Sequence, residues 1–540
     1  MGNKKGSFIK QAGILAAAGI ISRIIGILYR SPLTSVIGDE GNGYYQSAYS
    51  IYTIVLLLCS YSIPSALSKI IAEKLAKKEY RNVQKIFRCA LLYVFVVGGI
   101  ASIFLLFGAG LFLEGQAAVV LKAFAPTVFI SGFVGVLRGY FQAHGSMLQT
   151  SISQIIEQLL NAVVSILAAY LLIRATGSTD STDKAISGAV GSTIGTGSGV
   201  LIAFIFMICA YMLNCGYIKK RTARDQSGKV DSYRQIFGML LSMVTPIIIS
   251  TFIYNFNVSF NLVVYTKTMV HFKGFTSAQA ATQYGIFSGK SLVILNIPIA
   301  IAVAMSSAMI PAIASSRAIG DERATNRRIE NAMFVTLLIA IPCAVGLLVL
   351  AKPVMQLLFP QKDSLDLASR LLMMTAITVI FDSLSALGNG ILQGLGKVKI
   401  PVRNAAVALT LQSGILALLL AFTDLNLYAL VICLLIYSFT MFFLNTLSVH
   451  KYTGLKENVR KLYVWPVLAA FIMGAFAFAT YHVIYMLLPR NVIALICAIA
   501  VAGIVYFICV IKLKILTEEE LDLIPFGGKI VTVAEKMHLM

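Results

Sequence analysis

Apolar runs of about twenty residues recur along the whole chain, separated by short polar segments. A helix needs about 20 apolar residues to cross about 30 Å of hydrocarbon, and fourteen segments meet this length. They are residues 8–31, 44–70, 86–110, 119–142, 150–173, 186–213, 236–264, 284–313, 329–350, 366–394, 404–422, 428–449, 464–487 and 492–514. The pattern predicts an all-α membrane protein with fourteen transmembrane helices and no independent soluble domain.

Two sequence patterns occur once in each half of the chain. Residues 63–66 (Ile-Pro-Ser-Ala), at the end of the second span, match residues 310–313 (Ile-Pro-Ala-Ile), at the end of the eighth. Residues 139–145, which close the fourth span, match residues 390–396, which close the tenth. The offsets are 247 and 251 residues, and each repeat holds six spans. We expect two six-helix bundles in the same orientation, related by an axis along the membrane normal.

These repeats define four expected domains. Residues 1–235 form an N-terminal six-helix bundle with its cytoplasmic loop, and residues 236–450 form a second bundle. Residues 451–514 hold two extra transmembrane helices, and residues 515–540 form a cytoplasmic tail. Substrate is expected between the two bundles, near the middle of the membrane.

The composition agrees with membrane burial, since 58% of residues are hydrophobic and 12% are charged, against about 25% charged in soluble domains. The net charge is +21, which in a soluble protein would suggest nucleic acid as a partner. With the N-terminus inside, 32 of the 44 Lys and Arg residues, Arg138 among them, fall on cytoplasmic segments. The positive-inside rule therefore explains the excess without nucleic acid. We expect a multi-pass protein of the cell membrane with both termini in the cytoplasm.

The chain offers no nucleophile–base pair, metal-ligand cluster or phosphate-binding glycine loop. We therefore expect no enzyme activity, no metal and no cofactor, and turn to ionisable residues inside the spans, which are functional candidates. Arg23 and Arg30 lie seven residues apart on one face of the first helix. Two guanidinium groups suit a diphosphate, although Arg30 also fits an interfacial anchor.

Further polar residues lie inside the later spans. Lys290 follows Gly289 in the eighth span, where it binds a ligand or reaches the outer interface. Glu157 and Gln154 share a face of the fifth span, and Asp382 lies within the tenth; they serve as a coupling-cation site, as counter-charges, or as structural contacts between helices. Asn257 and Asn261 share a face of the seventh span and either meet sugar hydroxyls or bridge helices.

Several segments resemble one family: residues 19–23 with Arg30, 63–69, 137–142, 154–158 and 524–527. The resemblance is to the polysaccharide-export branch of the multidrug/oligosaccharidyl-lipid/polysaccharide (MOP) flippase superfamily, in particular to the group of stage V sporulation protein B and YtgP. It covers essentially the whole chain.

The resemblance implies a flippase for undecaprenyl-pyrophosphate-linked saccharides, foremost lipid II for peptidoglycan synthesis. MurJ-type flippases use arginines of the first helix for the diphosphate, and Arg23 and Arg30 look like the matching positions. Their last two helices form a groove for the lipid tail, which suits residues 464–514 here.

The expected partners are the lipid-linked glycan, membrane lipids and a coupling cation, with the protein acting as a monomer. Two alternatives stay open: a cation-coupled multidrug exporter of the same superfamily, and a non-transporting scaffold for cell-wall or spore assembly.

Overall fold

The computed structural model describes residues 18–19, 21–223, 225, 231–318, 320–455 and 458–513. These residues are helical or lie in short connections, and none of them forms a strand. The expected cytoplasmic tail, residues 515–540, and most of the first expected span lie outside them. Contacts divide the chain into two compact units, residues 1–289 and 290–540.

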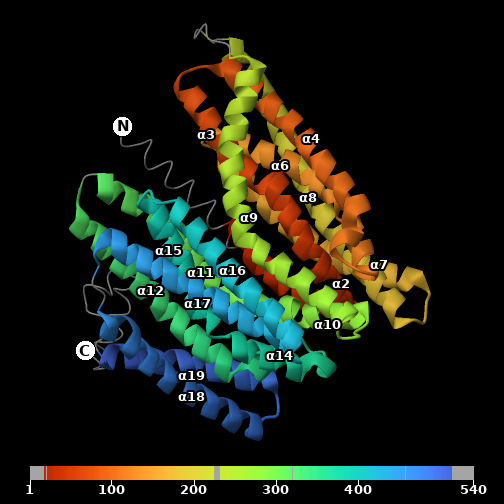
Figure 1. The fold of residues 1–540 in the computed structure, drawn as a ribbon, viewed down its shortest axis with the longest axis vertical. Helices are drawn as coiled ribbons and strands as arrows, with labels where there is room; N and C mark the ends of the chain where they lie inside the picture. The colour runs from red at the N-terminus through yellow and green to blue at the C-terminus, as the bar shows by residue number, and fades with distance from the viewer. Residues whose placement is uncertain are drawn as a thin grey trace. The chain divides into compact units, whose positions relative to one another are not determined.

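The first unit holds a helix over residues 21–28 that leads into α2, followed by the remaining elements to η2. Their bounds are α2 (Arg30–Leu56), η1 (Leu57–Tyr61), α3 (Ser62–Ala76), α4 (Tyr80–Phe112), α5 (Gln116–Ala123), α6 (Ala125–Ala143), α7 (Leu148–Thr176), α8 (Ser181–Ala223), α9 (Tyr233–His271), α10 (Ser277–Ile286) and η2 (Phe287–Ser291). The η elements are single π-helical turns. Helices α3, α4 and α8 all pack on α6, which lies at the centre of this group (Figure 1).

The second unit continues from η2 to the end of the described chain. Its bounds are α11 (Leu292–Ala318), α12 (Glu322–Val349), α13 (Ala351–Leu358), α14 (Lys362–Thr375), α15 (Thr378–Gly394), α16 (Lys399–Phe422), α17 (Leu427–Thr453), η3 (Arg460–Val464), α18 (Trp465–Leu487) and α19 (Asn491–Lys512). Helix α15 packs on α11, α12 and α17, and the C-terminal pair α18–α19 joins the unit through α12 and α13 (Figure 1).

Among the described residues, eleven helices are long and apolar enough to cross a membrane, or twelve when the bent pair α14–α15 is one span. The bend between α14 and α15 is 48°. The two remaining expected spans are residues 8–31, which are mostly outside the described part, and 236–264, which corresponds to α9. The protein is therefore a multi-pass helical membrane protein, and the count of fourteen stays a prediction.

The junction between the first two expected spans differs from the prediction. The sequence pattern predicts one span ending at residue 31 and the next beginning at residue 44, whereas α2 is helical across this interval. The helix is broken at Gly38, whose φ of 71° and ψ of 179° lie in a region open essentially to glycine alone. Polar residues follow the break. They interrupt the run of apolar residues between the first two expected spans, although the chain remains helical there.

Small residues allow close helix packing, as is common between membrane helices. Gly191, Gly195 and Gly199 recur every four residues along α8, and a Cβ added at any of them would collide with α7. Gly285 of α10 similarly packs against Gly43 of α2, because a Cβ added at Gly285 would collide with the Gly43 Cα. These glycines set which faces of the helices touch and so fix the positions of the polar side chains between them.

The same packing scheme occurs in both units. Helix α6 packs on α3, α4 and α8 in the first unit, as α15 packs on α11, α12 and α17 in the second; α7 pairs with α8, as α16 pairs with α17. One contact is matched closely, because Ser60 Oγ donates to the Ser131 carbonyl at 2.8 Å and Ser306 Oγ donates to the Ala386 carbonyl at 2.6 Å. The similar packing supports the internal repeat expected from the sequence, and the two-bundle layout stays a prediction.

The unit boundary lies at residues 289–290, because α9 packs on α2, α3 and α4, and α10 packs on α2. The repeat alone placed the second bundle at residue 236. The boundary at residues 289–290 divides the chain by contacts, which group α9 and α10 with the first unit. The boundary at residue 236 divides it by the sequence repeat, which counts α9 and α10 with the second bundle. The domain limits 1–235, 236–450 and 451–514 stay predictions.

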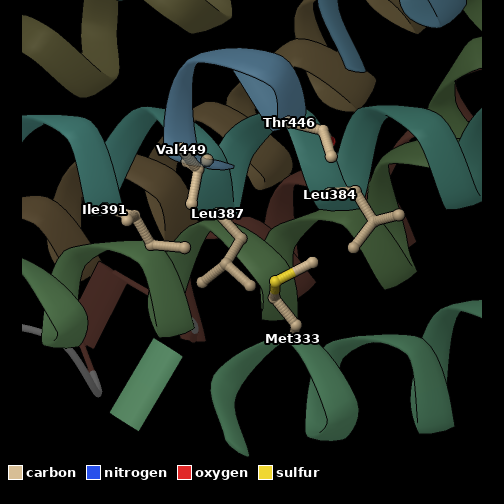
Figure 2. A pocket seen from close by; sticks show the side chains of 7 residues that line it. Met333, Leu384, Leu387, Ile391, Thr446 and Val449 are labelled. Atoms are coloured by element: carbon tan, nitrogen blue, oxygen red, sulfur yellow. The ribbon is translucent and has the colours of Figure 1, made fainter. Parts of the chain in front are cut away.

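The core of the second unit is apolar where α12, α15 and α17 meet. Figure 2 shows Met333 of α12, Leu384, Leu387 and Ile391 of α15, and Val449 of α17 around a small pocket. The pocket volume is about 10 Å³, roughly the space that a single water needs. This region holds the unit together and offers no room for a substrate.

Candidate functional site

The first unit contains a polar cavity of about 310 Å³. Its wall is formed by α2, η1 and α3 on one side and by α6, α7 and α8 on the other. Four of its lining side chains carry strong hydrogen-bonding groups: Arg138 and Gln142 of α6, and Gln154 and Glu157 of α7. Ligand pockets in proteins begin at about 300 Å³, so the cavity is large enough for a small group.

Close packing of α6 positions the arginine. Gly135 and Gly139 flank Arg138, and a Cβ added at Gly139 would lie 2.9 Å from Pro64 Cα. At Gly135 an added Cβ would lie 3.0 Å from the Ser60 carbonyl oxygen. The glycines bring α6 against η1 and α3, and the arginine between them borders the cavity.

Arg138 forms an ion pair with Glu157, and its Nη2 lies 2.7 Å from Glu157 Oε2. Arg138 Nε also donates to Ser153 Oγ at 2.9 Å. The two charged side chains are 15% and 23% exposed. From the sequence, Arg138 is expected only as a charge of a cytoplasmic segment; the structure adds that it neutralises an acid inside the unit. The sequence feature that could have indicated a role inside the protein is the position of Arg138 in an apolar span, between Gly135 and Gly139.

Gln154 lies one helical turn before Glu157 and lines the same cavity, as their spacing predicts. Its Oε1 is buried and has no hydrogen-bond partner among the described residues. A buried acceptor without a partner costs about 1–3 kcal/mol, so the atom is suited to accept a bond from water or a ligand.

Asn161 lies one turn beyond Glu157 on the same face of α7 and has different surroundings. Asn161 Oδ1 accepts hydrogen bonds from Ser165 Oγ at 2.9 Å and from Thr196 Oγ1 at 3.2 Å. Its amide nitrogen lies 3.5 Å from the Tyr29 hydroxyl. These contacts join α7, α8 and the residue before α2, so Asn161 connects helices.

The two arginines of the first helix differ in environment. Arg23 is exposed on the helix over residues 21–28. Arg30 is half-buried, with its Cζ 5.8 Å from the centre of the Tyr49 ring, a cation–π contact within α2. Both Arg30 and Glu157 interact electrostatically with the Tyr49 hydroxyl. Arg30 therefore lies near the polar part of the unit.

Asn257 and Asn261 lie on one face of α9, as predicted, because Asn261 Nδ2 donates to Asn257 Oδ1 at 3.0 Å. Asn257 is buried, and nearby Ser259 Oγ donates to the Ser50 carbonyl of α2 at 2.9 Å. Ser259 lies about 200° around the helix from Asn257, so this contact with α2 is made by the other side of α9.

Lys290 begins the second unit and is 1% exposed. Its Nζ donates to Gln361 Oε1 at 3.1 Å and to Ser364 Oγ at 2.7 Å, and it lies 5.8 Å from the centre of the Phe359 ring. The ammonium is therefore held beside the start of α14, which follows a connection that the expected topology places outside; ligand binding and an outer interfacial position both stay predictions.

Asp382 is half-buried in α15 of the second unit and interacts electrostatically with Tyr437 of α17. One to two turns further along α15, Asn445 of α17 donates to Ser385 Oγ at 3.3 Å and to Asn389 Oδ1 at 2.8 Å. The residues following Asp382 thus form a polar contact between α15 and α17.

Comparisons with known proteins give the family. Residues 8–317 match the Polysacc_synt family, described as Polysaccharide biosynthesis protein, and residues 288–419 match the MatE family. Stage V sporulation protein B of Bacillus subtilis (strain 168) is 24% identical over 98% of this chain and 99% of its own length. Lipid II flippase MurJ of the same organism is 25% identical over 74% of this chain and 75% of its own length.

Solved structures agree in fold. A lipid II flippase MurJ in an inward closed conformation has a TM-score of 0.65 at 15% identity, covering 92% of this chain and 97% of that one. An inward-facing multidrug resistance MATE family transporter of the MOP superfamily has a TM-score of 0.63 at 14% identity, covering 80% and 94%. The chain therefore belongs to the Polysacc_synt family, described as Polysaccharide biosynthesis protein, and shares its fold with these two solved proteins.

Proposed function

We propose that this protein moves an undecaprenyl-pyrophosphate-linked saccharide from the inner to the outer leaflet of the cell membrane. Lipid II is the foremost candidate for this substrate. The observation that carries the proposal is the pairing of Glu157 with Arg138. A cationic drug in the cavity beside Glu157 would need an acidic group left to attract it, whereas Glu157 is already neutralised by Arg138. The remaining charges of the first helix, Arg23 and Arg30, are positive and suit an anionic head group.

In the proposed cycle, Arg23 and Arg30 bind the pyrophosphate through bidentate hydrogen bonds, and the polyprenyl tail stays in lipid beside residues 464–514. Asn257 and Asn261 offer amide groups to the saccharide. The two bundles then alternate access to the two sides of the membrane. The protein acts as a monomer and performs no covalent chemistry.

Asp382 is the proposed site of cation coupling. It is a carboxylate in a membrane-spanning helix, where a charge is costly unless it has a function or a partner. Glu157 and Gln154 were candidates for the same task, and the Arg138 charge beside Glu157 disfavours a cation there. We propose Glu157 as the counter-charge of an arginine. Lys290 takes part only if it leaves Gln361 and Ser364 during the cycle.

A cation-coupled multidrug exporter is the second candidate, because the MatE match over residues 288–419 includes Asp382. The two candidates differ in the charge of the substrate. Transport assays with lipid II and with a cationic dye, in the same preparation, separate them.

The test is flipping of fluorescent lipid II by the purified protein in proteoliposomes. We expect Arg23→Ala to abolish flipping and Arg23→Lys to retain part of it, since lysine keeps the charge and loses the bidentate geometry. Arg30→Ala should be equally severe if both arginines hold the pyrophosphate. Arg174→Ala is the matched control, because Arg174 also lies over a tyrosine ring, at 4.5 Å from that of Tyr170, and is exposed at the end of α7.

Wild-type protein that transports a cationic dye and leaves lipid II in place would overturn the proposal in favour of the exporter. Unchanged flipping by Arg23→Ala and Arg30→Ala at equal protein levels would remove these residues from the substrate site.

A further inference from the structure

We propose that the cavity of the first unit is a binding site for one sugar ring of the transported head group. The cavity is the one lined by Arg138, Gln142, Gln154 and Glu157. The inference rests on the proposed function. It adds a subsite that binds the saccharide, while Arg23 and Arg30 bind the pyrophosphate.

Size limits the occupant. The cavity volume of about 310 Å³ lies at the lower end of the range of about 300–1,000 Å³ that ligand pockets occupy. This is enough for one pyranose ring with its hydroxyl groups and too little for a whole lipid-linked oligosaccharide. The remainder of the head group would lie outside the cavity.

The balance of charge points to a neutral ligand. Arg138 and Glu157 are joined at 2.7 Å and cancel each other, and the other strong groups are the two neutral amides of Gln142 and Gln154. A cation placed beside Glu157 would also meet the Arg138 guanidinium, and an anion beside Arg138 would meet the Glu157 carboxylate. A neutral polar group is repelled neither by the Arg138 guanidinium nor by the Glu157 carboxylate.

The mixture of donors and acceptors points to hydroxyl groups. Arg138 uses Nε for Ser153 and Nη2 for Glu157, which leaves further N–H groups of the guanidinium to donate. Gln154 Oε1 is buried and accepts no bond from the described residues. A sugar hydroxyl both donates and accepts, so neighbouring hydroxyls of one ring satisfy both kinds of group at once.

An aromatic wall completes the site. The ring of Tyr52, which lines the cavity, is buried and stacks on the Phe124 ring, with 4.3 Å between ring centres and 19° between ring planes. Small-molecule sites commonly combine such apolar walls with a few well-placed polar groups. The less polar face of a pyranose ring suits this wall while its hydroxyls face α6 and α7.

The test compares two probes on the full-length protein in nanodiscs: bare undecaprenyl pyrophosphate, and the same lipid carrying a disaccharide. We expect Gln154→Ala to weaken binding of the saccharide-bearing lipid by about tenfold, the loss of one or two hydrogen bonds. Binding of the bare pyrophosphate should be unchanged. Gln154→Asn keeps the amide on a side chain one carbon shorter, and should weaken binding of the saccharide-bearing lipid less than Gln154→Ala does.

Gln356→Ala is the matched control, because Gln356 is exposed on α13 and lies outside the cavity. An equal loss for both probes, or for neither, with Gln154→Ala would overturn the inference and leave the proposed function standing. A changed sodium or proton dependence of flipping, with saccharide binding intact, would overturn it in favour of cation coupling. Wild-type protein that binds neither probe would overturn the proposed function and this inference together.

Discussion

Arg138 and Glu157 place two opposite charges inside a membrane-spanning unit, 2.7 Å apart. Removing one partner of a buried ion pair leaves the other without compensation and costs about 3–5 kcal/mol when both are fully buried. Here the side chains keep 15% and 23% exposure to the cavity, so the loss should be smaller. We therefore expect the pair to stabilise the folded protein in addition to forming part of the cavity wall.

We expect Glu157→Gln to lower the free energy of unfolding by more than 1 kcal/mol, because the Arg138 charge loses its partner. The double variant Arg138→Gln, Glu157→Gln should recover most of this loss while transport stays impaired. Thermal unfolding of the purified protein in detergent measures the effect. Glu73→Gln is the control, since Glu73 pairs with Lys77 at the surface, where such pairs contribute about 0–1 kcal/mol. Equal destabilisation by Glu73→Gln and Glu157→Gln would contradict the expectation.

The sequence predicts part of this site and misses the rest for a physical reason. The spacing of Gln154 and Glu157 places them on one face of α7, and both line the cavity. The partner Arg138 lies on α6, across a turn made by Gly145 with φ of 76°. Which residues of two adjacent helices face each other depends on the geometry of that turn and on the glycine packing of α6. Hydrophobic periodicity alone contains neither.

Among the helices, α12 contains Pro342, which cannot donate a backbone hydrogen bond to the Leu338 carbonyl one turn earlier. The Tyr506 hydroxyl of α19 donates to this carbonyl at 3.0 Å. The C-terminal helix thus satisfies a backbone group that the proline leaves without its usual partner. This contact helps to explain how the two extra helices join the second unit.

We expect Tyr506→Phe to lower the free energy of unfolding by about 0.5–1.5 kcal/mol, the contribution of one hydrogen bond. In a Pro342→Ala background the alanine N–H can bond to Leu338 and the same substitution should cost much less. Thermal unfolding of the four proteins forms a double-mutant cycle. An identical loss in both backgrounds would show that the tyrosine acts through packing alone.

Another contact between elements lies where α3 ends and α9 begins. Lys74 Nζ lies 2.7 Å from Glu79 Oε2 and 2.5 Å from Asp231 Oδ2, and Asn82 Nδ2 donates to Glu79 Oε2 at 2.9 Å. The hydrogen bond from Lys74 lowers the pKa of Glu79 below its ordinary value of 4.5. The cluster ties the α3–α4 turn to the residue before the Ser232 cap of α9.

A lowered pKa in the folded state means that the contribution of Glu79 is fully present above pH 4.5 and is lost as the pH falls through the lowered pKa. We expect wild-type protein to lose stability over this acidic range more steeply than Glu79→Gln. At neutral pH the variant should be the less stable of the two, and the gap should narrow with acid. Parallel pH profiles for the two proteins would contradict this role for Glu79.

The apolar runs predict most helices of this chain because a membrane span needs a fixed length of apolar residues. The break at Gly38 and the π-helical turns η1, η2 and η3 are not predicted. They are local departures inside otherwise helical sequence, and they depend on tertiary contacts such as that of Gly289 with Asn42. The 48° bend between α14 and α15 is missed for the same reason.

For the molecule as a whole, contacts within the first unit agree with the expected alternation of loops. Arg81 N donates to Asp225 at 2.6 Å, which joins the α3–α4 turn to the segment between α8 and α9. At the far ends of α4 and α9, Glu114 Oε1 lies 2.6 Å from His271 Nε2. The first pair of segments was expected in the cytoplasm and the second pair outside.

We expect cysteines introduced at Ser227 and Glu519, both outside the described residues, to resist an impermeant thiol reagent in intact cells. A cysteine at Thr179, in the exposed connection between α7 and α8, should react quickly and serves as the control. The reason is the cytoplasmic position of most basic residues under the positive-inside rule. Labelling at Ser227→Cys and Glu519→Cys together with protection at Thr179→Cys would reverse the orientation.

The internal repeat makes the last prediction. Six spans in each copy keep the two copies in the same orientation across the membrane, so an axis along the membrane normal relates them. The matched packing of α6 with its neighbours and α15 with its neighbours supports duplication of the whole bundle. In an experimental structure, residues 8–213 should superpose on 236–449 by about half a turn about the normal. An axis in the membrane plane would require an odd number of spans in each copy, and would show that the sequence matches at 247 and 251 residues arose without duplication of the six-helix unit.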